Sequence, residues 1–334
     1  MDVTTKIYVG ILVLSSILSS VAAGRLTGHG LHAGFYRRSC PQAERIVLEV
    51  VSQAVVENPG LAAGLIRLHF HDCFVNGCDA SILLDSTPSG EPIEKVSPGN
   101  IGLRGCDLID EAKSRLEEEC PKTVSCADIL AYAARDAISL SGFPAFLVPG
   151  GRRDGLSSRA DDVAGNLPVP IPDLDQMLQI FEKKGMTQDD LVVLLGSHSI
   201  GVVHCTVISN NLYNFNLTHQ VDPSLDPIYA LYLRTRCPPP GSDSLPGTVV
   251  PIDPTPSGNR LNNMFYLNLM QARAVIPSDQ VLFSDQRTRN QVIEMALDYR
   301  RWSKKFLKAM VKMGRIDVLT GRKGEIRRAC RAVN

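Results

Sequence analysis

The chain has 334 residues, of which 44% are hydrophobic and 21% are charged, proportions that exclude an intrinsically disordered or collagen-like protein. The 35 basic and 35 acidic residues cancel, so no overall attraction to nucleic acid or acidic lipid is expected. The expected partner is therefore a small molecule.

The N-terminus has the three-part layout of a secretory signal peptide. Lys6 precedes an uncharged run over residues 7–23, and small residues, Val21 and Ala23, stand at the expected cleavage positions. A transmembrane anchor is the alternative, but this run, interrupted by serines, barely reaches the length that about 30 Å of hydrocarbon requires. We predict a signal peptide over residues 1–23, a mature domain over 24–334 without a membrane anchor, and an extracellular location. Because few residues follow Cys330, no vacuolar sorting extension is expected.

Apolar periodicity predicts helices through most of the remaining chain. The expected helices cover residues 41–58, 61–74, 108–116 and about 291–313, the last ending at Gly314. Two patterns that resemble capping boxes, Ser125-x-x-Asp128 and Thr187-x-x-Asp190, predict the starts of two further helices. The best strand signal is Ala145–Val148 before Pro-Gly-Gly, where a short hairpin is expected. The segment 238–263, rich in Pro, Gly, Ser and Asn, is predicted to be a loop.

The segment from Gly64 to Ser81 concentrates side chains that can carry chemistry. Arg67 and His71 are four residues apart, so on a helix they share a face. A permanent positive charge beside a proton-exchanging imidazole suits a reaction in which negative charge builds on a departing oxygen. The alternative is a surface arginine beside a structural histidine. His69 points to another face and is interpreted as structural.

Oxygen-bearing side chains, Asp72, Asp79 and Ser81, surround the short loop between two cysteines of the same segment. Hard oxygen ligands bunched in this way suit calcium, although the spacing is not that of an EF-hand. Solvated turn residues are the alternative. Later in the chain His198 ends the apolar stretch LVVLLGSHSIG, on the face of Leu191 and Leu194. It is either a satisfied core histidine or a ligand to haem iron.

Nine cysteines fit an exported protein, because thiols pair in an oxidising compartment. The odd count leaves at least one without an intramolecular partner. A zinc site is a weak alternative, since no CxxC pair occurs. Asn216-Leu217-Thr218 is the only N-glycosylation sequon, and Asn216 is predicted to carry a glycan.

The motif RLHFHDCFVNGCDAS, followed later by LLGSHSIG, resembles the secretory plant haem peroxidases, class III of the plant peroxidase superfamily. The resemblance runs from Gly34 to Asn334 and includes TVSCADILA, GGRRDG, NLPVP, LYNF and SDQVLF. It implies an all-α fold with at most a short β-hairpin, in which haem b lies between a distal and a proximal helical half.

The resemblance assigns a role to each matching residue of the haem site. His71 would be the distal acid–base residue, and Arg67 would stabilise the leaving oxygen of hydrogen peroxide. Asn100 would accept a hydrogen bond from His71. On the proximal side His198 would be the iron ligand, and Asp279 would hydrogen-bond it and make the imidazole more electron-donating.

Donor and calcium sites are also implied by the resemblance. Pro168 would help to position aromatic donors. A distal calcium ion would bind to Asp72, Val75, Gly77, Asp79 and Ser81, with Glu94 linked through water. A proximal calcium ion would bind to Ser199, Asp253, Thr255 and Asn262. Because Asn262 stands where the family has an aspartate, weaker proximal binding is expected.

The resemblance further implies four disulfides, which are Cys40–Cys120, Cys73–Cys78, Cys126–Cys330 and Cys205–Cys237. Cys106 is left over and is interpreted as a buried, inert thiol. Gly64 and His204 stand where the family has polar partners for the haem propionates, so haem anchoring is expected to differ there.

The implied activity is reduction of hydrogen peroxide to water with one-electron oxidation of phenolic donors by a monomeric enzyme. Such activity serves lignin and suberin formation, cell-wall cross-linking, the oxidative stress response and peroxide removal. A hydrolase built on His71, Asp72 and Cys73 is a weaker hypothesis, because adjacent helix residues do not face one another. A non-catalytic wall-binding protein is disfavoured because all five residues of the haem site are retained.

Overall fold

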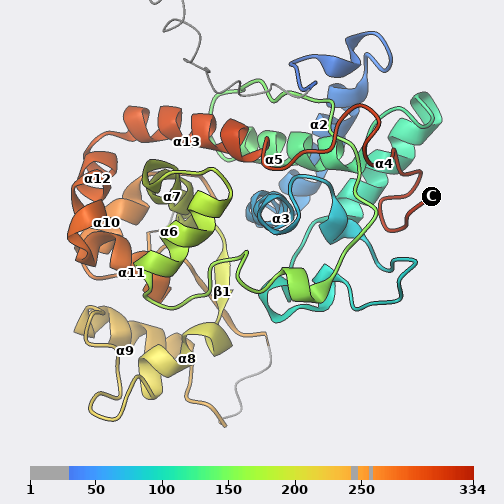
Figure 1. The fold of residues 1–334 in the computed structure, drawn as a ribbon. Helices are drawn as coiled ribbons and strands as arrows, with labels where there is room; N and C mark the ends of the chain where they lie inside the picture. Colours follow the sequence, from blue (N-terminus) through green and yellow to red (C-terminus); the bar gives the residue numbers. More distant parts are fainter. Residues whose placement is uncertain (1–29, 242–246, 256–258) are drawn as a thin grey trace, which may run out of the picture.

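The computed structural model describes residues 30–241, 247–255 and 259–334 (Figure 1). The predicted signal peptide lies outside these residues. The described chain is mainly α-helical, which confirms the predicted fold class. Its helices are α2 Ala43–Glu57, α3 Leu61–Val75, α4 Cys106–Glu119, α5 Cys126–Leu140, α6 Leu174–Lys183, α7 Gln188–Leu195, α8 Cys205–Tyr213, α9 Pro227–Arg236, α10 Met264–Met270, α11 Pro277–Ser284, α12 Gln286–Leu297 and α13 Tyr299–Met313.

Short 3-10 turns connect several of these helices. They are η1 Phe35–Arg37, η2 Ser81–Leu83, η3 Glu94–Val96, η4 Pro98–Asn100, η5 Ala160–Asp162 and η6 Gly196–Ser199. No helix within the described ranges combines the length and the apolar character that a membrane crossing requires.

Helix α5 is the centre of one half of the molecule. Every side chain from Cys126 to Ile138 is buried, and many of them are alanines. A helix that is buried on all sides must be covered by other elements, and α2 and α3 pack against it (Figure 1). This packing places α3, with its predicted chemistry, in the middle of the fold.

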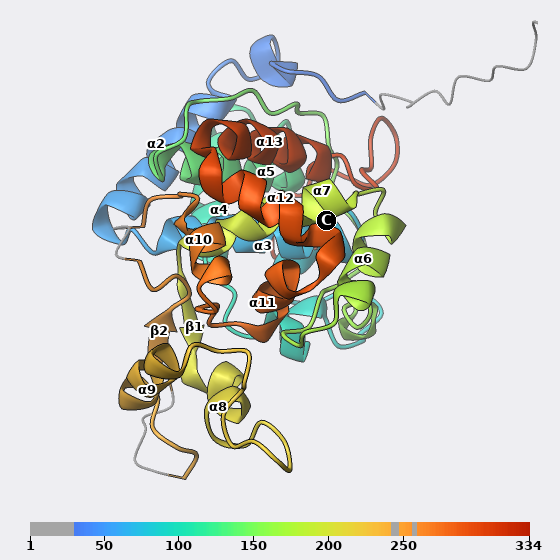
Figure 2. The ribbon, with the colours of Figure 1, turned by 90° about the vertical axis from the view of Figure 1, so that its left-hand side faces the viewer.

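The second half is built around α7. Helices α12 and α13 pack against α7, and α10 packs against α12 and against the turn η6 that follows α7. Trp302, Phe306 and Met310 of α13 are buried in this half. Helices α8 and α9 form a separate projection, seen at the bottom of Figures 1 and 2, with a small apolar core of its own.

The predicted helix starts are confirmed in detail. Ser125 accepts a hydrogen bond from the backbone N–H of Asp128 at the start of α5. Thr187 and Asp190 form a full capping box at the start of α7, each side chain binding the other residue's backbone.

The predicted helix over residues 291–313 is wrong in one respect, because two helices occupy this segment. Asp298 has an extended backbone, with φ −134° and ψ 90°, and its side chain accepts a hydrogen bond from Arg301 N. An aspartate at this position caps a new helix, so α12 ends at Leu297 and α13 begins at Tyr299. The spacing of apolar residues alone does not reveal the break between the two helices, because buried residues resume at Trp302.

The predicted hairpin near Ala145–Val148 is also wrong. The only sheet in the described part of the chain pairs β1 Val202–His204 with β2 Val249–Pro251, antiparallel, with Val203 opposite Val250. β2 lies inside the segment predicted to be a loop. Three-residue strands joined by a long connection give almost no alternation of apolar and polar residues to detect in a sequence. Their pairing depends instead on packing in the apolar core of the α8–α9 projection, which includes Val203 and Val250.

All nine cysteines lie within the described residues, and the four implied disulfides are confirmed. They are Cys40–Cys120, Cys73–Cys78, Cys126–Cys330 and Cys205–Cys237. Cys106 at the start of α4 is the free cysteine and is partly buried. His69 lies against the Cys73–Cys78 disulfide, with its Nδ1 3.6 Å from Cys73 Sγ. Because the two sulfurs are bonded to each other, they offer no thiolate to a metal.

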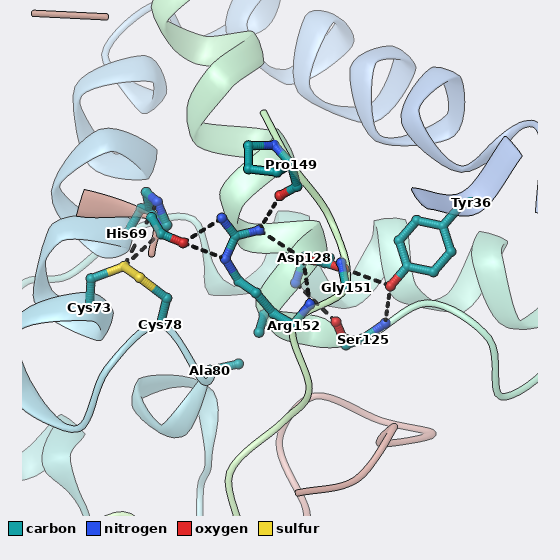
Figure 3. Close-up of polar contacts among 12 residues, drawn as sticks. Tyr36, His69, Cys73, Cys78, Ala80, Ser125, Asp128, Pro149, Gly151 and Arg152 are labelled. Atoms are coloured by element: carbon teal, nitrogen blue, oxygen red, sulfur yellow. Dashed lines mark hydrogen bonds and ion pairs between the residues drawn. A yellow bond between two sulfur atoms is a disulfide. The ribbon is translucent and has the colours of Figure 1, made fainter. Parts of the chain in front are cut away.

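A buried ion pair joins the start of the chain, α5 and the segment after α13 (Figure 3). Arg152 is wholly buried; its Nη1 donates to Asp128 Oδ1 at 2.8 Å and to Pro149 O at 2.7 Å. Its Nε donates to Gly314 O at 2.8 Å. The other oxygen of Asp128 accepts from Tyr36 Oη at 2.7 Å. Each charge therefore has several partners, as burial of an ion requires.

Replacing Arg152 by methionine should destabilise the protein strongly, because Asp128 would be left as an uncompensated buried charge. We expect a loss of about 3–5 kcal/mol in the free energy of unfolding, measured by denaturant titration of the disulfide-intact protein. Arg301→Met, which removes an exposed ion pair with Glu294, is the matched control and should cost about 1 kcal/mol or less. Equal stabilities of the two variants would contradict the importance of the buried pair.

Cys106 should be detectable as a single, slow thiol. Burial raises the pKa of Cys106, so little reactive thiolate exists at neutral pH. Iodoacetamide should modify the native protein slowly, faster as the pH rises, and faster again after denaturation without reduction. Mass spectrometry should find one alkylated cysteine per denatured chain; a second would be incompatible with four complete disulfides.

Candidate active site

Helix α3 presents Arg67 and His71 on one face, as their spacing predicts. Arg67 Nε donates to His71 Nε2 at 3.2 Å, and Arg67 Nη2 donates to Gly99 O at 3.2 Å. On the other side of the imidazole, His71 Nδ1 lies 2.6 Å from Asn100 Oδ1. An amide oxygen only accepts, so this contact assigns the proton to Nδ1 and leaves Nε2 as the basic nitrogen.

Asn100 is held in place by a backbone contact that sequence analysis did not find. Its Nδ2 donates to the carbonyl oxygen of Glu94 at 2.8 Å. The orientation of the His71 ring therefore depends on the η3–η4 segment. A backbone acceptor leaves no residue-type signal in a sequence, which is why only the side chain of Glu94 was predicted to be functional.

His71 is kept neutral by its surroundings. Burial lowers the pKa of His71 to about 3, and the positive charge of Arg67 acts in the same direction. The ring is thus an unprotonated base at neutral pH, while the adjacent guanidinium keeps its charge. This pair can accept a proton and stabilise negative charge at neighbouring points.

His198 lies in η6, one turn beyond α7. The prediction that it continues the helix is wrong, because α7 ends at Leu195. Its Nδ1 lies 3.0 and 2.9 Å from the two carboxylate oxygens of Asp279 in α11. Burial alone would lower the pKa of His198, but the charge and hydrogen bond of Asp279 outweigh it, and the pKa is raised.

The two histidine groups are linked electrostatically through Arg67. The charge of Arg67 acts on His198, lowering its pKa, so the guanidinium lies within electrostatic reach of the second imidazole. Since Asp279 occupies Nδ1 of His198, only Nε2 is available as a ligand atom. One imidazole oriented by a carboxylate, together with a neutral histidine and an arginine, fits the donor chemistry of a haem site.

The loop after α3 fits a calcium ion. Three of its buried oxygens have no hydrogen-bond partner, namely Asp72 Oδ1, Ser81 Oγ and Glu94 Oε2. Burial raises the pKa of Asp79 to about 6 and of Glu94 to about 7. Unpartnered oxygens on buried, mutually repelling acids are the environment that a divalent cation stabilises.

Backbone positions of this loop were predicted as ligands as well. Gly77 has a φ of 99°, and a Cβ there would lie 2.7 Å from Asp317 O, so only glycine fits. The carbonyl oxygen of Val75 accepts from Lys184 Nζ at 2.9 Å, which leaves it one further lone pair.

The second predicted calcium site is less complete. Asp253 Oδ2 is buried without a partner, and burial raises the pKa of Asp253 to about 6. Its Oδ1 accepts from Thr255 N at 2.6 Å, and Ser199 Oγ accepts from Asn262 N at 3.1 Å. The side-chain oxygen of Asn262, however, accepts from Met264 N at 2.8 Å. One of the two lone pairs of this neutral amide oxygen is therefore already used, so Asn262 offers less to a cation than a carboxylate would.

Two other predicted positions can be located in the fold. Leu167 packs close to Gly99, because a Cβ added at Gly99 would lie 3.7 Å from Leu167 Cδ1. Pro168, the next residue, therefore follows a side chain packed against the segment that carries Asn100. Asn216 is exposed in a tight turn, where its Oδ1 accepts from Thr218 N at 2.9 Å and from His219 N at 2.8 Å.

The chain is similar to known proteins over most of its length. The family model described as Peroxidase matches residues 47–298. The chain is 48% identical to Peroxidase 5 of Vitis vinifera over 305 residues, which cover 91% of this chain and 92% of that protein. It is 42% identical to Peroxidase 9 of Arabidopsis thaliana over 91% of this chain and 87% of that protein, and 42% identical to Peroxidase 25 of the same plant over 98% and 97%.

Proposed function

This chain belongs to the peroxidase family of plants, and we propose that Arg67, His71 and Asn100 form the peroxide-cleaving side of its active site, with His198 and Asp279 on the iron-binding side. The enzyme reduces hydrogen peroxide and oxidises small donors, and the family generally binds haem and calcium. The observation that carries the proposal is the presence of a neutral, Asn100-bound His71 and an Asp279-bound His198, both under the influence of the charge of Arg67.

His198 Nε2 would bind the iron of haem b, and Asp279 would hold the ring and strengthen its electron donation. When bound, haem supplies the redox-active iron at which the O–O bond of hydrogen peroxide is broken. His71 Nε2 would take the proton from one peroxide oxygen and return it to the other as that oxygen leaves. Arg67 would stabilise the negative charge on the departing oxygen.

The donor, calcium and glycan assignments follow the same logic. Pro168 would border the approach of phenolic donors. Two calcium ions would bind, the distal one at the loop of Asp72, Asp79, Ser81, Val75 and Gly77 with Glu94, and the proximal one at Ser199, Asp253, Thr255 and Asn262. A glycan at the exposed Asn216 and removal of residues 1–23 fit an extracellular, monomeric enzyme.

The alternatives are less well supported. A hydrolase using Cys73 as nucleophile is contradicted by the Cys73–Cys78 disulfide. A non-catalytic wall-binding protein would have no use for a desolvated base held against an arginine and an asparagine.

Replacing His71 by leucine should remove the proton carrier while leaving the His198 side intact. We expect the haem-loaded variant to react with peroxide about 10²–10⁴ times more slowly, in stopped-flow absorbance measurements. Asn100→Val should give a smaller loss, because the base remains but its tautomer is no longer fixed. His219→Leu, an exposed histidine, is the matched control. An undiminished rate in His71→Leu would exclude the proposed role.

The two calcium sites should differ in strength. After buffer exchange without calcium, elemental analysis should find one ion retained per chain, because the distal loop offers three unpartnered buried oxygens and the proximal site one. Ser81→Ala should lose the retained ion and unfold at a lower temperature, whereas Thr255→Ala should keep it. Two equally tight ions in a calcium titration of the metal-free protein would refute this ranking.

A further inference from the structure

A continuous chain of aromatic rings leads from His198 to the surface of α13. The His198 ring lies 6.2 Å from Phe265, and Phe265 lies 5.1 Å from Tyr266. Tyr266 lies 6.0 Å from Trp302, and Trp302 lies 5.8 Å from Tyr299. The rings belong to η6, α10 and α13; α13 packs against α7, as Figures 1 and 2 show, and α10 packs against η6. Each step is a ring contact, so the path contains no gap.

The middle of this chain also touches the turn of His198 directly. A Cβ at Gly196, two residues before His198, would lie 2.6 Å from Trp302 Nε1 and 2.6 Å from Tyr266 Oη. Both rings are therefore pressed against η6. The only tryptophan of the protein thus lies a single ring contact from the surface tyrosine.

The buried members can pass an electron but cannot keep a radical. Tyr266 Oη donates to Val192 O at 2.9 Å, and Trp302 Nε1 donates to Val193 O at 3.1 Å. A backbone carbonyl does not take up a proton, and burial raises the pKa of Tyr266 well above its usual range. Oxidation of either ring is therefore transient, and Phe265 serves only as a bridge.

Tyr299 differs because it is 39% exposed, so its phenol can release a proton to water. Its neighbour Leu297 is 76% exposed and adds apolar surface beside it. Tyr232 on α9 is even more exposed, at 47%, but its described ring contact is with Tyr229, in the separate core of the projection. Among the ring contacts of the described residues, the chain that begins at His198 reaches only one exposed phenol, that of Tyr299.

We propose that Tyr299 is a second oxidation site, at which phenolic polymers too large to approach His71 are oxidised. The inference rests on the proposed function, since the peroxide reaction supplies the oxidising equivalents. His71 and Asn100 are only 8% and 2% exposed, so a phenol fixed within a polymer has little direct access to them. Tyr299 and Leu297 instead offer an exposed ring and exposed apolar surface where α12 ends and α13 begins.

The reaction balances in electrons and protons. Hydrogen peroxide takes up two electrons and two protons to form two water molecules. For each electron, Tyr299 gives one through Trp302 and Tyr266 to the oxidised centre at His198 and releases its hydroxyl proton to solvent. A phenol of the polymer then returns one electron and one proton to Tyr299. One peroxide thus yields two phenoxyl radicals on the polymer and leaves Tyr299 unchanged.

The test compares Tyr299→Phe, which keeps the ring and its packing, with Tyr232→Phe, which removes an exposed phenol outside the chain. Each haem-loaded enzyme is given hydrogen peroxide with guaiacol or with a soluble synthetic polymer of coniferyl alcohol. We expect Tyr299→Phe to lose polymer oxidation by about tenfold or more while its guaiacol turnover stays within about twofold. Tyr232→Phe should match the wild type with both donors.

A spectroscopic measurement without donor makes the test independent of turnover. Freeze-quenched wild type and Tyr232→Phe should show a tyrosyl radical by electron paramagnetic resonance, and Tyr299→Phe should lack it. Undiminished polymer oxidation in Tyr299→Phe, no polymer oxidation by the wild type, or an unchanged radical would each overturn the inference. Failure of the wild type to oxidise guaiacol would instead overturn the proposed function, and this inference with it.

Discussion

Burial of helix α3 is the constraint on which the rest of the site depends. The helix lies in the middle of the fold against α5, and yet it carries the buried polar side chains of His69, His71 and Asp72, with Arg67 exposed. Buried polar groups are stable only when they have partners, so the surrounding segments are placed to supply them. On the active-site face, Gly99 O accepts from Arg67 and Asn100 Oδ1 accepts from His71. On another face of the helix, Ala80 N donates to Asp72 at 3.1 Å.

These contacts link the proposed calcium loop to the proposed catalytic base. Glu94 Oε2 is one of the unpartnered buried oxygens, while the carbonyl of Glu94 holds Asn100 and, through it, His71. A cation that neutralises the buried acids would also hold η3 and η4 in position. Metal binding and proton transfer would then depend on the same short segment.

The second half combines stability and chemistry in a similar way. Trp302 and Tyr266 fill the core beside η6 and hydrogen-bond to Val192 and Val193 in α7, the helix that leads into the turn of His198. Large aromatic side chains bury much apolar area, which accounts for their place there. The same close packing is what connects His198 to the surface at Tyr299.

Much of this could be predicted from local sequence. The spacing of Arg67 and His71, the caps at Ser125 and Thr187 and the oxygen-rich loop are all properties of neighbouring residues, and helices express them directly. The capping role of Asp298 was equally local, but it was hidden by an apolar pattern that resumes at Trp302 in the next helix.

The sequence by itself determined the helical class and the chemistry of α3, because hydrogen bonds and side-chain faces within a helix depend on residues a few positions apart. Only the tertiary structure decided the pairing of β1 with β2, the carbonyl of Glu94 that holds Asn100, and the ring path to Tyr299. Those contacts join segments distant in the chain, and they form only where packing of the whole core brings the segments together.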